Sequence, residues 1–262
     1  MTSFNHIDIN LSGNKLILNL LPALPHDSKT LVLNGHIAAE GQFPHQVSIA
    51  YREVVWLIDQ CGGAIISENY VLTSALCLQK RLPEGVAVVA GTNDVNNKIY
   101  MYDVEKIIRH PLLNFHTKEN DIALLKLKKS FDKVPKIQSI PLPTKNDSLK
   151  VGDVATVSGW GRNQRKIVSD SQLRFTSVVI SDQNKCSKRY ENQGPIHDTN
   201  VCAYDPHTPT GPCFRDEGGP LTVNGKLFGI VSWSIGDCAD DDFPSIYTRV
   251  SPYLEWIKEN AV

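Results

Sequence analysis

The stretch that decides the fold of this chain reads Gly211-Pro212-Cys213-Phe214-Arg215-Asp216-Glu217-Gly218-Gly219-Pro220. It sets two adjacent carboxylates ahead of two glycines and a proline, the residues that most often mark a turn. Shortly after it, Asn224-Gly225 stands between Thr222-Val223 and Lys226-Leu227-Phe228, a strong signal for a two-residue β-hairpin. The stretch therefore predicts a tight loop that leads into a pair of antiparallel strands.

Outward from this loop, strand-like runs recur at short intervals with turn residues between them. This spacing is typical of a β-sandwich or barrel and not of alternating βαβ units. Two helices are expected, one capped by Asp182 and running through Tyr190, the other starting with Ser251 as N-cap. The sequence thus predicts an all-β fold that ends in a helix. The expected strands cover residues 47–51, 64–66, 86–90, 102–108, 122–127, 154–158, 173–180, 227–231 and 246–250.

Composition narrows the functional classes. The chain has 262 residues, of which 41% are hydrophobic and 21% charged, and this suits one large or two small domains. A net charge of -1 gives no overall attraction to nucleic acid or to an anionic membrane. No apolar run approaches the ~20 residues that span a bilayer. Six cysteines suggest three disulfides and an oxidising compartment, with their connectivity left open.

The opening stretch resembles the nucleophile loop of chymotrypsin- and trypsin-like serine proteases (family S1), whose pattern is Gly-Asp-Ser-Gly-Gly-Pro. Asp216 and the Gly-Gly-Pro match, whereas Glu217 stands where the family has its serine. Residues 32–48 resemble the family's mature start, so the resemblance runs from Val32 to the C-terminus. It implies two six-stranded antiparallel β-barrels with a C-terminal α-helix, the lobes covering about residues 32–140 and 141–250. Residues 1–31 are then a tail or propeptide.

The resemblance also implies a disulfide set and an activation step. In the family, a cut after Arg or Lys frees an amino terminus that pairs with the Asp beside the nucleophile, here Asp216. The residue before Val32 is Leu31, and the nearest basic residue is Lys29. We therefore predict that the chain is not activated in the usual way. The implied disulfides are Cys61–Cys77, Cys186–Cys202 and Cys213–Cys238.

The catalytic positions depart from the family pattern. The family's base lies in Thr-Ala-Ala-His-Cys, which reads Thr73-Ser74-Ala75-Leu76-Cys77 here. Leucine has no lone pair and no titrating proton, so no acid–base step can use Leu76. The third triad member survives as Asp121, and the nucleophile position is Glu217. With two of three positions replaced, the sequence predicts that the chain is not an enzyme.

The substrate-binding positions differ as well. Arg215 and Glu217 supply the oxyanion-hole positions, and the family has glycine where Arg215 lies. The Arg215 side chain either folds over the hole and pairs with Glu217 or points to solvent. Gly211 falls at the floor of the specificity pocket, where trypsin-like members carry Asp. Ser234 and Ser245 replace wall glycines and are expected to narrow the pocket.

A carboxylate that has lost its imidazole needs other partners. We expect Asp121 to be partly buried, to accept a hydrogen bond from Ser232, and to have a raised pKa, because burial disfavours the charged form. No metal or cofactor is expected, since the family's calcium loop reads as a short segment, 92–98, with almost no acid. A basic run is interpreted as a solvated strand edge, with a polyanion site as the alternative. It contains Lys126, Lys128, Lys129, Lys133 and Lys136.

These observations favour a secreted, monomeric, catalytically inactive serine protease homologue that acts by binding proteins. The expected partners belong to a host proteolytic cascade such as complement, with the chain as decoy or inhibitor. In its several triad losses it resembles the inactivated serine protease paralogues of the scabies mite. Two alternatives remain open, namely a hydrolase that uses non-standard catalytic residues and a structural or storage protein. Asn10 and Asn146 begin sequons that a secreted chain can glycosylate.

Overall fold

The structure is a computed structural model that describes residues 32, 35–53, 57–161, 171–236, 238 and 243–262. The predicted tail 1–31, its junction at Leu31 and the sequon at Asn10 lie outside the described residues. Asn146 lies in an exposed turn. None of the described helices is long and apolar enough to cross a membrane.

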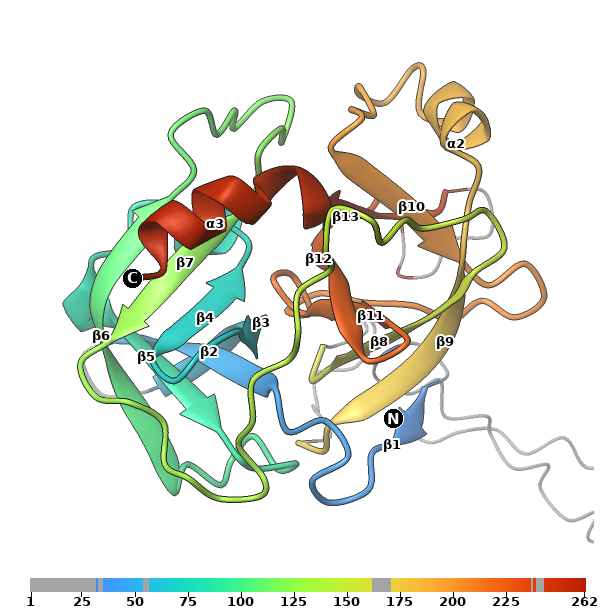
Figure 1. The fold of residues 1–262 in the computed structure, drawn as a ribbon. Coiled ribbons are helices and arrows are strands. Elements are labelled where there is room, and N and C mark those ends of the chain that lie inside the picture. Colours follow the sequence, from blue (N-terminus) through green and yellow to red (C-terminus); the bar gives the residue numbers. More distant parts are fainter. Residues whose placement is uncertain (1–31, 33–34, 54–56, 162–170, 237, 239–242) are drawn as a thin grey trace, which may run out of the picture.

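The first barrel is closed by six antiparallel strands in the order β2-β3-β4-β7-β6-β5 (Figure 1). Alternate residues of β2, such as Val47, Ile49 and Tyr51, point inward and are buried in its core. Alternation thus explains why this run forms a strand with one face in the core. The six strands are β2 Gln46–Arg52, β3 Leu57–Ile65, β4 Tyr70–Thr73, β5 Val86–Ala90, β6 Tyr100–Arg109 and β7 Ala123–Leu127.

The second barrel is built on the same principle. Its strands follow the order β9-β10-β13-β12-β11-β8, and β8 pairs with both β9 and β11, which closes the ring. β1 (His36–Ile37) adds to the outside of β9. The two closed barrels confirm the predicted fold. The strands are β8 Val154–Gly159, β9 Arg174–Ile180, β10 Asn200–Tyr204, β11 Pro220–Val223, β12 Lys226–Trp233 and β13 Ser245–Arg249.

The hairpin predicted at Asn224-Gly225 is present between β11 and β12, with Val223 opposite Lys226. Both turn residues have positive φ, 49° at Asn224 and 72° at Gly225. That combination defines the turn type whose twist matches a pair of antiparallel strands. The hairpin therefore joins β11, the strand that follows the nucleophile loop, to the next strand of the second barrel.

The helices largely follow the prediction. In α2 (Gln183–Arg189), the Asp182 side chain accepts from the Lys185 N–H at 2.9 Å, as expected of an N-cap. The C-terminal helix differs in its first turn, because Ser251–Tyr253 forms the 3-10 helix η3 and its N-cap position is Val250 and not Ser251. The α-helix α3 (Leu254–Asn260) begins after that turn.

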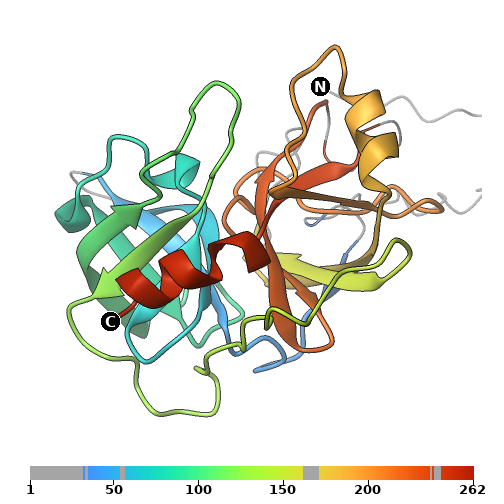
Figure 2. The same ribbon diagram turned by 45° about the horizontal axis from the view of Figure 1, so that its top comes forward.

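The two barrels share a hydrophobic cluster to which α3 also contributes. Figures 1 and 2 show α3 lying across the first barrel. Leu72 and Leu124 enter it from the first barrel, Ile230 from the second, and Ile257 from α3. The Tyr70 hydroxyl donates to the carbonyl of Val262 at 2.6 Å and fixes the end of the chain on the first barrel. Buried apolar contacts therefore hold the two barrels against each other.

Three disulfides pin the loops, and all three have the pairing that the resemblance implies: Cys61–Cys77, Cys186–Cys202 and Cys213–Cys238. They are the type of bond that persists in an oxidising compartment. The lobe boundary near residue 140 stays a prediction. It falls in the long segment without strands between β7 and β8 that crosses from one barrel to the other (Figure 1).

Candidate functional site

Asp121 lies just before β7, at the junction of the two barrels, and is fully buried. The Ser232 hydroxyl donates to Oδ2 at 2.6 Å, which confirms the predicted partner. Ser232 belongs to the second barrel, and two further donors come from the first. They are the Leu76 N–H, 2.8 Å from Oδ1, and the Ser74 hydroxyl, 2.7 and 2.9 Å from Oδ1 and Oδ2. Asp121 is therefore a buried carboxylate whose oxygens are satisfied from both lobes.

The electrostatics of Asp121 follow from this position. Burial raises the pKa of Asp121 above its ordinary value, and the hydrogen bonds from Ser232, Leu76 and Ser74 act in the opposite direction. The direction agrees with the prediction from sequence, although the residue is fully and not partly buried. The carboxylate keeps its place in the fold through hydroxyl and amide donors in place of an imidazole.

Leu76 occupies the position of the family's base. It begins the 3-10 helix η1 (Leu76–Leu78) and is half-buried. Its backbone still contacts Asp121, so the local geometry of the loop is intact. The side chain offers neither a lone pair nor a proton. Hydrolysis at this site must therefore use groups other than a histidine at this position.

The nucleophile loop keeps the backbone path that the family's glycine would favour. Arg215 has φ +78°, in the left-handed region that favours glycine. Its backbone N–H donates to Oε2 of Glu217 at 2.7 Å. The backbone N–H of Glu217 itself also hydrogen-bonds this carboxylate and opposes the rise in its pKa that burial causes. The Glu217 side chain thus folds back onto the two N–H groups of its own loop.

These two N–H groups lie at the predicted oxyanion-hole positions. In acyl transfer, such donors bind the oxygen that becomes negative in the transition state. Here the Glu217 carboxylate takes the place of that oxygen. Burial raises the pKa of Glu217, and the negative charge of Asp121 raises it further, whereas the Arg215 guanidinium lowers it. The donors are therefore occupied by a residue of the protein itself.

Asp216 is the second fully buried carboxylate of the site, after Asp121. Its Oδ1 accepts from the Gly161 N–H at 2.7 Å and its Oδ2 from the Cys213 N–H at 2.9 Å. Burial, together with the charge of Glu217, raises the pKa of Asp216 to about 7, although the two N–H groups oppose this shift. In the described part of the chain no cationic side chain forms an ion pair with Asp216. Backbone amides hold the carboxylate instead.

The specificity pocket is small, with a cavity of about 110 Å³. Phe214, Glu217, Trp233 and Ser234 are among the residues that line it. Of the other predicted pocket residues, Gly211 and Ser245 are buried and lie outside the cavity lining. Ser234 therefore contacts the cavity as predicted, whereas Ser245 belongs to the packed wall of β13.

A cation contacts Trp233, one of the residues that line this cavity. The Lys118 ammonium of the first barrel lies 3.9 Å from the centre of the Trp233 ring of the second. Burial lowers the pKa of Lys118, and the charge of Asp121 acts against this shift. The distance is that of a cation–π contact, so Lys118 bridges the two lobes across the cleft.

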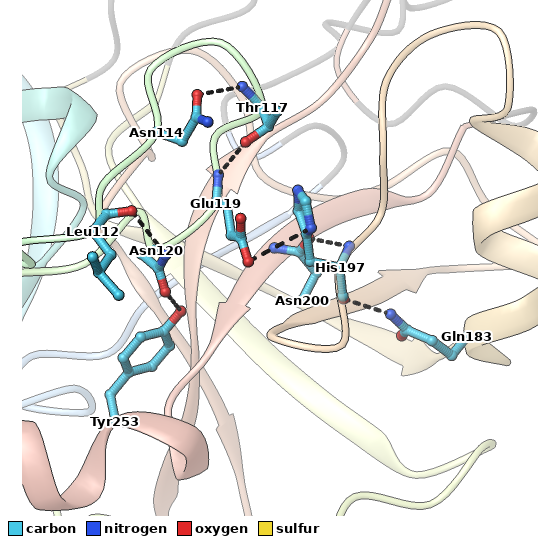
Figure 3. A network of polar contacts seen from close by, with 9 residues as sticks. All are labelled: Leu112, Asn114, Thr117, Glu119, Asn120, Gln183, His197, Asn200 and Tyr253. Carbon is cyan, nitrogen blue, oxygen red and sulfur yellow. Dashed lines mark hydrogen bonds and ion pairs between the residues drawn. The ribbon is translucent and has the colours of Figure 1, made fainter.

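A polar network ties the same loop to the second barrel further out (Figure 3). The Glu119 carboxylate lies 3.8 Å from Nδ1 of His197, which is held by Asn200 through its backbone N–H at 2.9 Å. On the other side, the Tyr253 hydroxyl donates to Asn120 at 2.9 Å. The segment between β6 and β7 is thus anchored both to the loop around His197 and to the C-terminal region.

Sequence reasoning missed three of these contacts. Ser74 had a signal, because the family motif has alanine at that position and a hydroxyl there faces the aspartate. Lys118 over Trp233 had none, because this contact depends on how loops from different parts of the chain meet. The inward turn of Glu217 is local to its own loop, but a linear pattern does not record which way a side chain turns.

Comparison with known proteins agrees with the fold. A family model described as trypsin matches residues 32–257. The chain is 31% identical to a vitellin-degrading protease of Bombyx mori over 87% of its length and 85% of the relative's. It is 34% identical to a trypsin of Simulium vittatum over 82% of its length and 87% of the relative's. Among solved structures, it matches neuropsin, a serine protease expressed in the limbic system of mouse brain, with a TM-score of 0.77 and 29% identity, covering 87% of this chain and 99% of that one.

These comparisons correct one prediction. The replaced triad positions had suggested that the chain is not an enzyme, but the relatives are named as trypsins and proteases and so point to an enzyme. The prediction failed because it equated the loss of two side chains with the loss of all activity. Groups outside the triad also contribute to activity. With the family model covering nearly the whole fold and the relatives aligned along most of their length, the chain belongs to the trypsin family of serine proteases.

Proposed function

We propose that this trypsin-family chain is secreted and acts by binding a protein of a proteolytic cascade, as a decoy or inhibitor. The observation that carries the proposal is the Glu217 carboxylate, which occupies the N–H groups of Arg215 and of its own backbone. Lys118 lies over Trp233, which lines the same cavity as Glu217. A peptide that enters the cleft meets both side chains, whereas binding through exposed loops requires neither to move.

The loop between β6 and β7 is the surface best suited to such binding. It stands out from the first barrel in both views (Figures 1 and 2). Leu112 is 71% exposed and Phe115 46% exposed. Residues 110–117 contain no Asp, Glu, Lys or Arg. Depletion of charge around exposed aromatic and aliphatic side chains is typical of the centre of a protein–protein interface.

The same loop is fixed before any partner arrives. The Asn114 side chain accepts from the N–H groups of His116 and Thr117 at 2.9 and 3.1 Å. Asn120 donates to the Leu112 carbonyl at 2.9 Å (Figure 3). A loop that is already ordered loses less conformational entropy on binding. Leu112 and Phe115 are therefore presented as rigid apolar anchors for an apolar pocket on the partner.

The test uses complement, the cascade suggested by the resemblance to the scabies mite paralogues. The purified protein is added to serum, and lysis of antibody-coated erythrocytes is measured. We expect the wild-type protein to reduce lysis and to capture a complement component when immobilised. The Leu112→Ser/Phe115→Ser variant should lose both effects, with affinity reduced at least about tenfold, because two interface anchors are removed.

The matched control is Val151→Ser/Val154→Ser, which removes two valines that are 65% and 62% exposed at the start of the second barrel. It should behave as the wild type. Equal loss in both variants would show that the loop between β6 and β7 is not the binding surface. Unchanged lysis with the wild-type protein at saturating concentration would overturn the cascade role.

The second candidate is hydrolysis of peptides by groups other than the usual triad, and the names of the relatives favour it. Glu217 is the carboxylate closest in position to the family's nucleophile. A broad peptide library, read out by mass spectrometry, measures this activity directly. Cleavage that disappears in Glu217→Ala but persists in Leu112→Ser/Phe115→Ser would establish hydrolysis at this site, separately from binding.

A further inference from the structure

A basic hollow beside α2 lies apart from the cleft. It has a volume of about 350 Å³ and is lined by Ser181, Lys185, Lys188, Arg189, Glu191 and Tyr204. Three of the six side chains are cationic and one is a carboxylate. In Figure 1 α2 is the gold helix at the outer edge of the second barrel. The hollow therefore offers an excess of positive charge on an exposed part of the surface.

The cations are adjacent because of helical spacing. Lys185, Lys188 and Arg189 stand three and four positions apart, so they share one face of α2. Like charges at this spacing repel one another and destabilise a helix unless a counter-ion is present. Within the part of the chain that the structure describes, the ammonium groups of Lys185 and Lys188 make no ion pair. An anion from outside the protein would relieve this repulsion.

The basic run between Lys126 and Lys136 differs from the face of α2 in its ion pairs and in its shape. Lys126 lies 3.4 Å from the Glu105 carboxylate and Lys136 lies 2.5 Å from that of Glu40. Two of its five lysines are thus neutralised by the protein. It also follows a strand and the segment after it and does not converge on one point. The face of α2 combines charge with a concave shape, which the run lacks.

The hollow is also preformed. Cys186 of α2 is bonded to Cys202 of β10, two residues before Tyr204. The disulfide therefore holds the lysine face and the aromatic wall at a fixed separation. The Arg189 guanidinium lies 5.6 Å from the centre of the Tyr204 ring. An aromatic wall packs against a sugar ring, and Ser181 and Glu191 can exchange hydrogen bonds with its hydroxyl groups.

We propose that this hollow binds a sulfated saccharide. The sulfate groups contact Lys185, Lys188 and Arg189, and the sugar ring lies on Tyr204. Ammonium and guanidinium groups form strong charge-assisted hydrogen bonds with such oxyanions. The proposal concerns a surface distinct from the cleft and from the loop between β6 and β7, so it stands or falls independently of the proposed function.

The experiment measures binding of the full chain to an immobilised heparin-derived hexasaccharide by surface plasmon resonance. We expect binding that weakens as NaCl rises, because salt screens the ionic contacts. Lys185→Gln/Lys188→Gln should weaken it at least about tenfold. The matched control Lys128→Gln/Lys129→Gln removes the same charge from two exposed lysines of the basic run and should bind as the wild type. Thermal unfolding verifies that both variants are folded.

Three further ligands decide what is recognised. The fully desulfated hexasaccharide should not bind. Inorganic sulfate should compete only at far higher concentration than the sulfated hexasaccharide, and vesicles containing anionic phospholipid should not bind through these lysines. Equal loss in the two double variants, or no loss in Lys185→Gln/Lys188→Gln, would overturn the site. The saccharide would be ruled out as the ligand of the hollow by either of two results. One is that inorganic sulfate competes as well as the sulfated hexasaccharide, and the other is that vesicle binding depends on Lys185 and Lys188.

Discussion

At the scale of single residues, the site shows how a buried carboxylate persists after its usual partner is replaced. Asp121 is inaccessible to water, and an unpaired charge in that position is costly. Ser74, Ser232 and the Leu76 N–H donate to it, and the Ser74 hydroxyl spans both oxygens. The hydroxyl of Ser74 compensates for the imidazole that the family places at the Leu76 position.

Removing that hydroxyl tests the compensation. Ser74→Ala should lower the free energy of unfolding by about 1–3 kcal/mol, because one donor to a buried carboxylate is lost. Urea denaturation at pH 7 with the disulfides intact measures the change. In a Leu76→His background the same substitution should cost less, since the imidazole can then donate to Asp121. An identical loss in both backgrounds would show that Ser74 does not act through Asp121.

At the scale of elements, the nucleophile loop is pressed against the first barrel with no room for side chains. Gly218 has φ +84°, and a Cβ on it would approach the Thr73 hydroxyl at 2.2 Å and the Gly62 carbonyl at 2.4 Å. The Gly62 N–H in turn donates to the Glu217 carbonyl at 2.8 Å. The fold retains glycine at this position for the sake of contact between β3, β4 and the loop, whatever residue stands at 217.

Gly218→Ala should therefore lower the free energy of unfolding by about 2–4 kcal/mol, through overpacking and through the left-handed backbone together. Gly225→Ala is the matched control. Gly225 also has positive φ, at 72°, but a Cβ there meets nothing within 4 Å. Gly225→Ala should therefore lower the free energy of unfolding by only about 1 kcal/mol. Equal losses in urea denaturation would mean that backbone conformation alone, and not the contact between the barrels, requires Gly218.

At the scale of the whole molecule, two fully buried carboxylates near the junction of the two barrels, Asp121 and Asp216, make stability depend on pH. The pKa of Asp216 is raised from 3.8 to about 7. Between these values the folded state keeps its proton and the unfolded state has lost it. The stabilisation is therefore complete below about pH 4 and is lost as pH rises to 7. His45 acts oppositely, because burial lowers its pKa to about 4. Its contribution to the free energy of unfolding therefore increases with pH until the pH reaches 6.5, the pKa of the residue in the unfolded state.

Comparison with Asp216→Asn separates these contributions. The difference in free energy of unfolding between the wild type and Asp216→Asn should shift against the wild type from pH 4 to pH 7. The shift should be on the order of several kcal/mol, since each pKa unit corresponds to about 1.4 kcal/mol. Urea denaturation at half-unit pH steps provides the curve. A difference that is constant over this range would show that Asp216 titrates normally.

The local sequence was a good guide where a pattern repeats. Residues 86–90 were predicted as a strand and form β5 with the same ends, and Asn224-Gly225 formed its hairpin. β4 (Tyr70–Thr73) and β10 (Asn200–Tyr204) were missed. Each is four or five residues long and almost entirely buried, so neither shows the alternation that marks a strand with one face in water.

By itself, the sequence determined the all-β fold, the two capped or amphipathic helices and the identity of the side chains at the catalytic positions. It did so because periodicity, turn residues and loop motifs are local properties of the chain. Only the tertiary structure decided where Glu217 points, that Lys118 lies over Trp233, and that α2 borders a basic hollow. The contact of Lys118 with Trp233 and the hollow between α2 and Tyr204 arise where segments far apart in the sequence meet. The direction of Glu217 is set within its own loop, by backbone N–H groups that the sequence letters do not place.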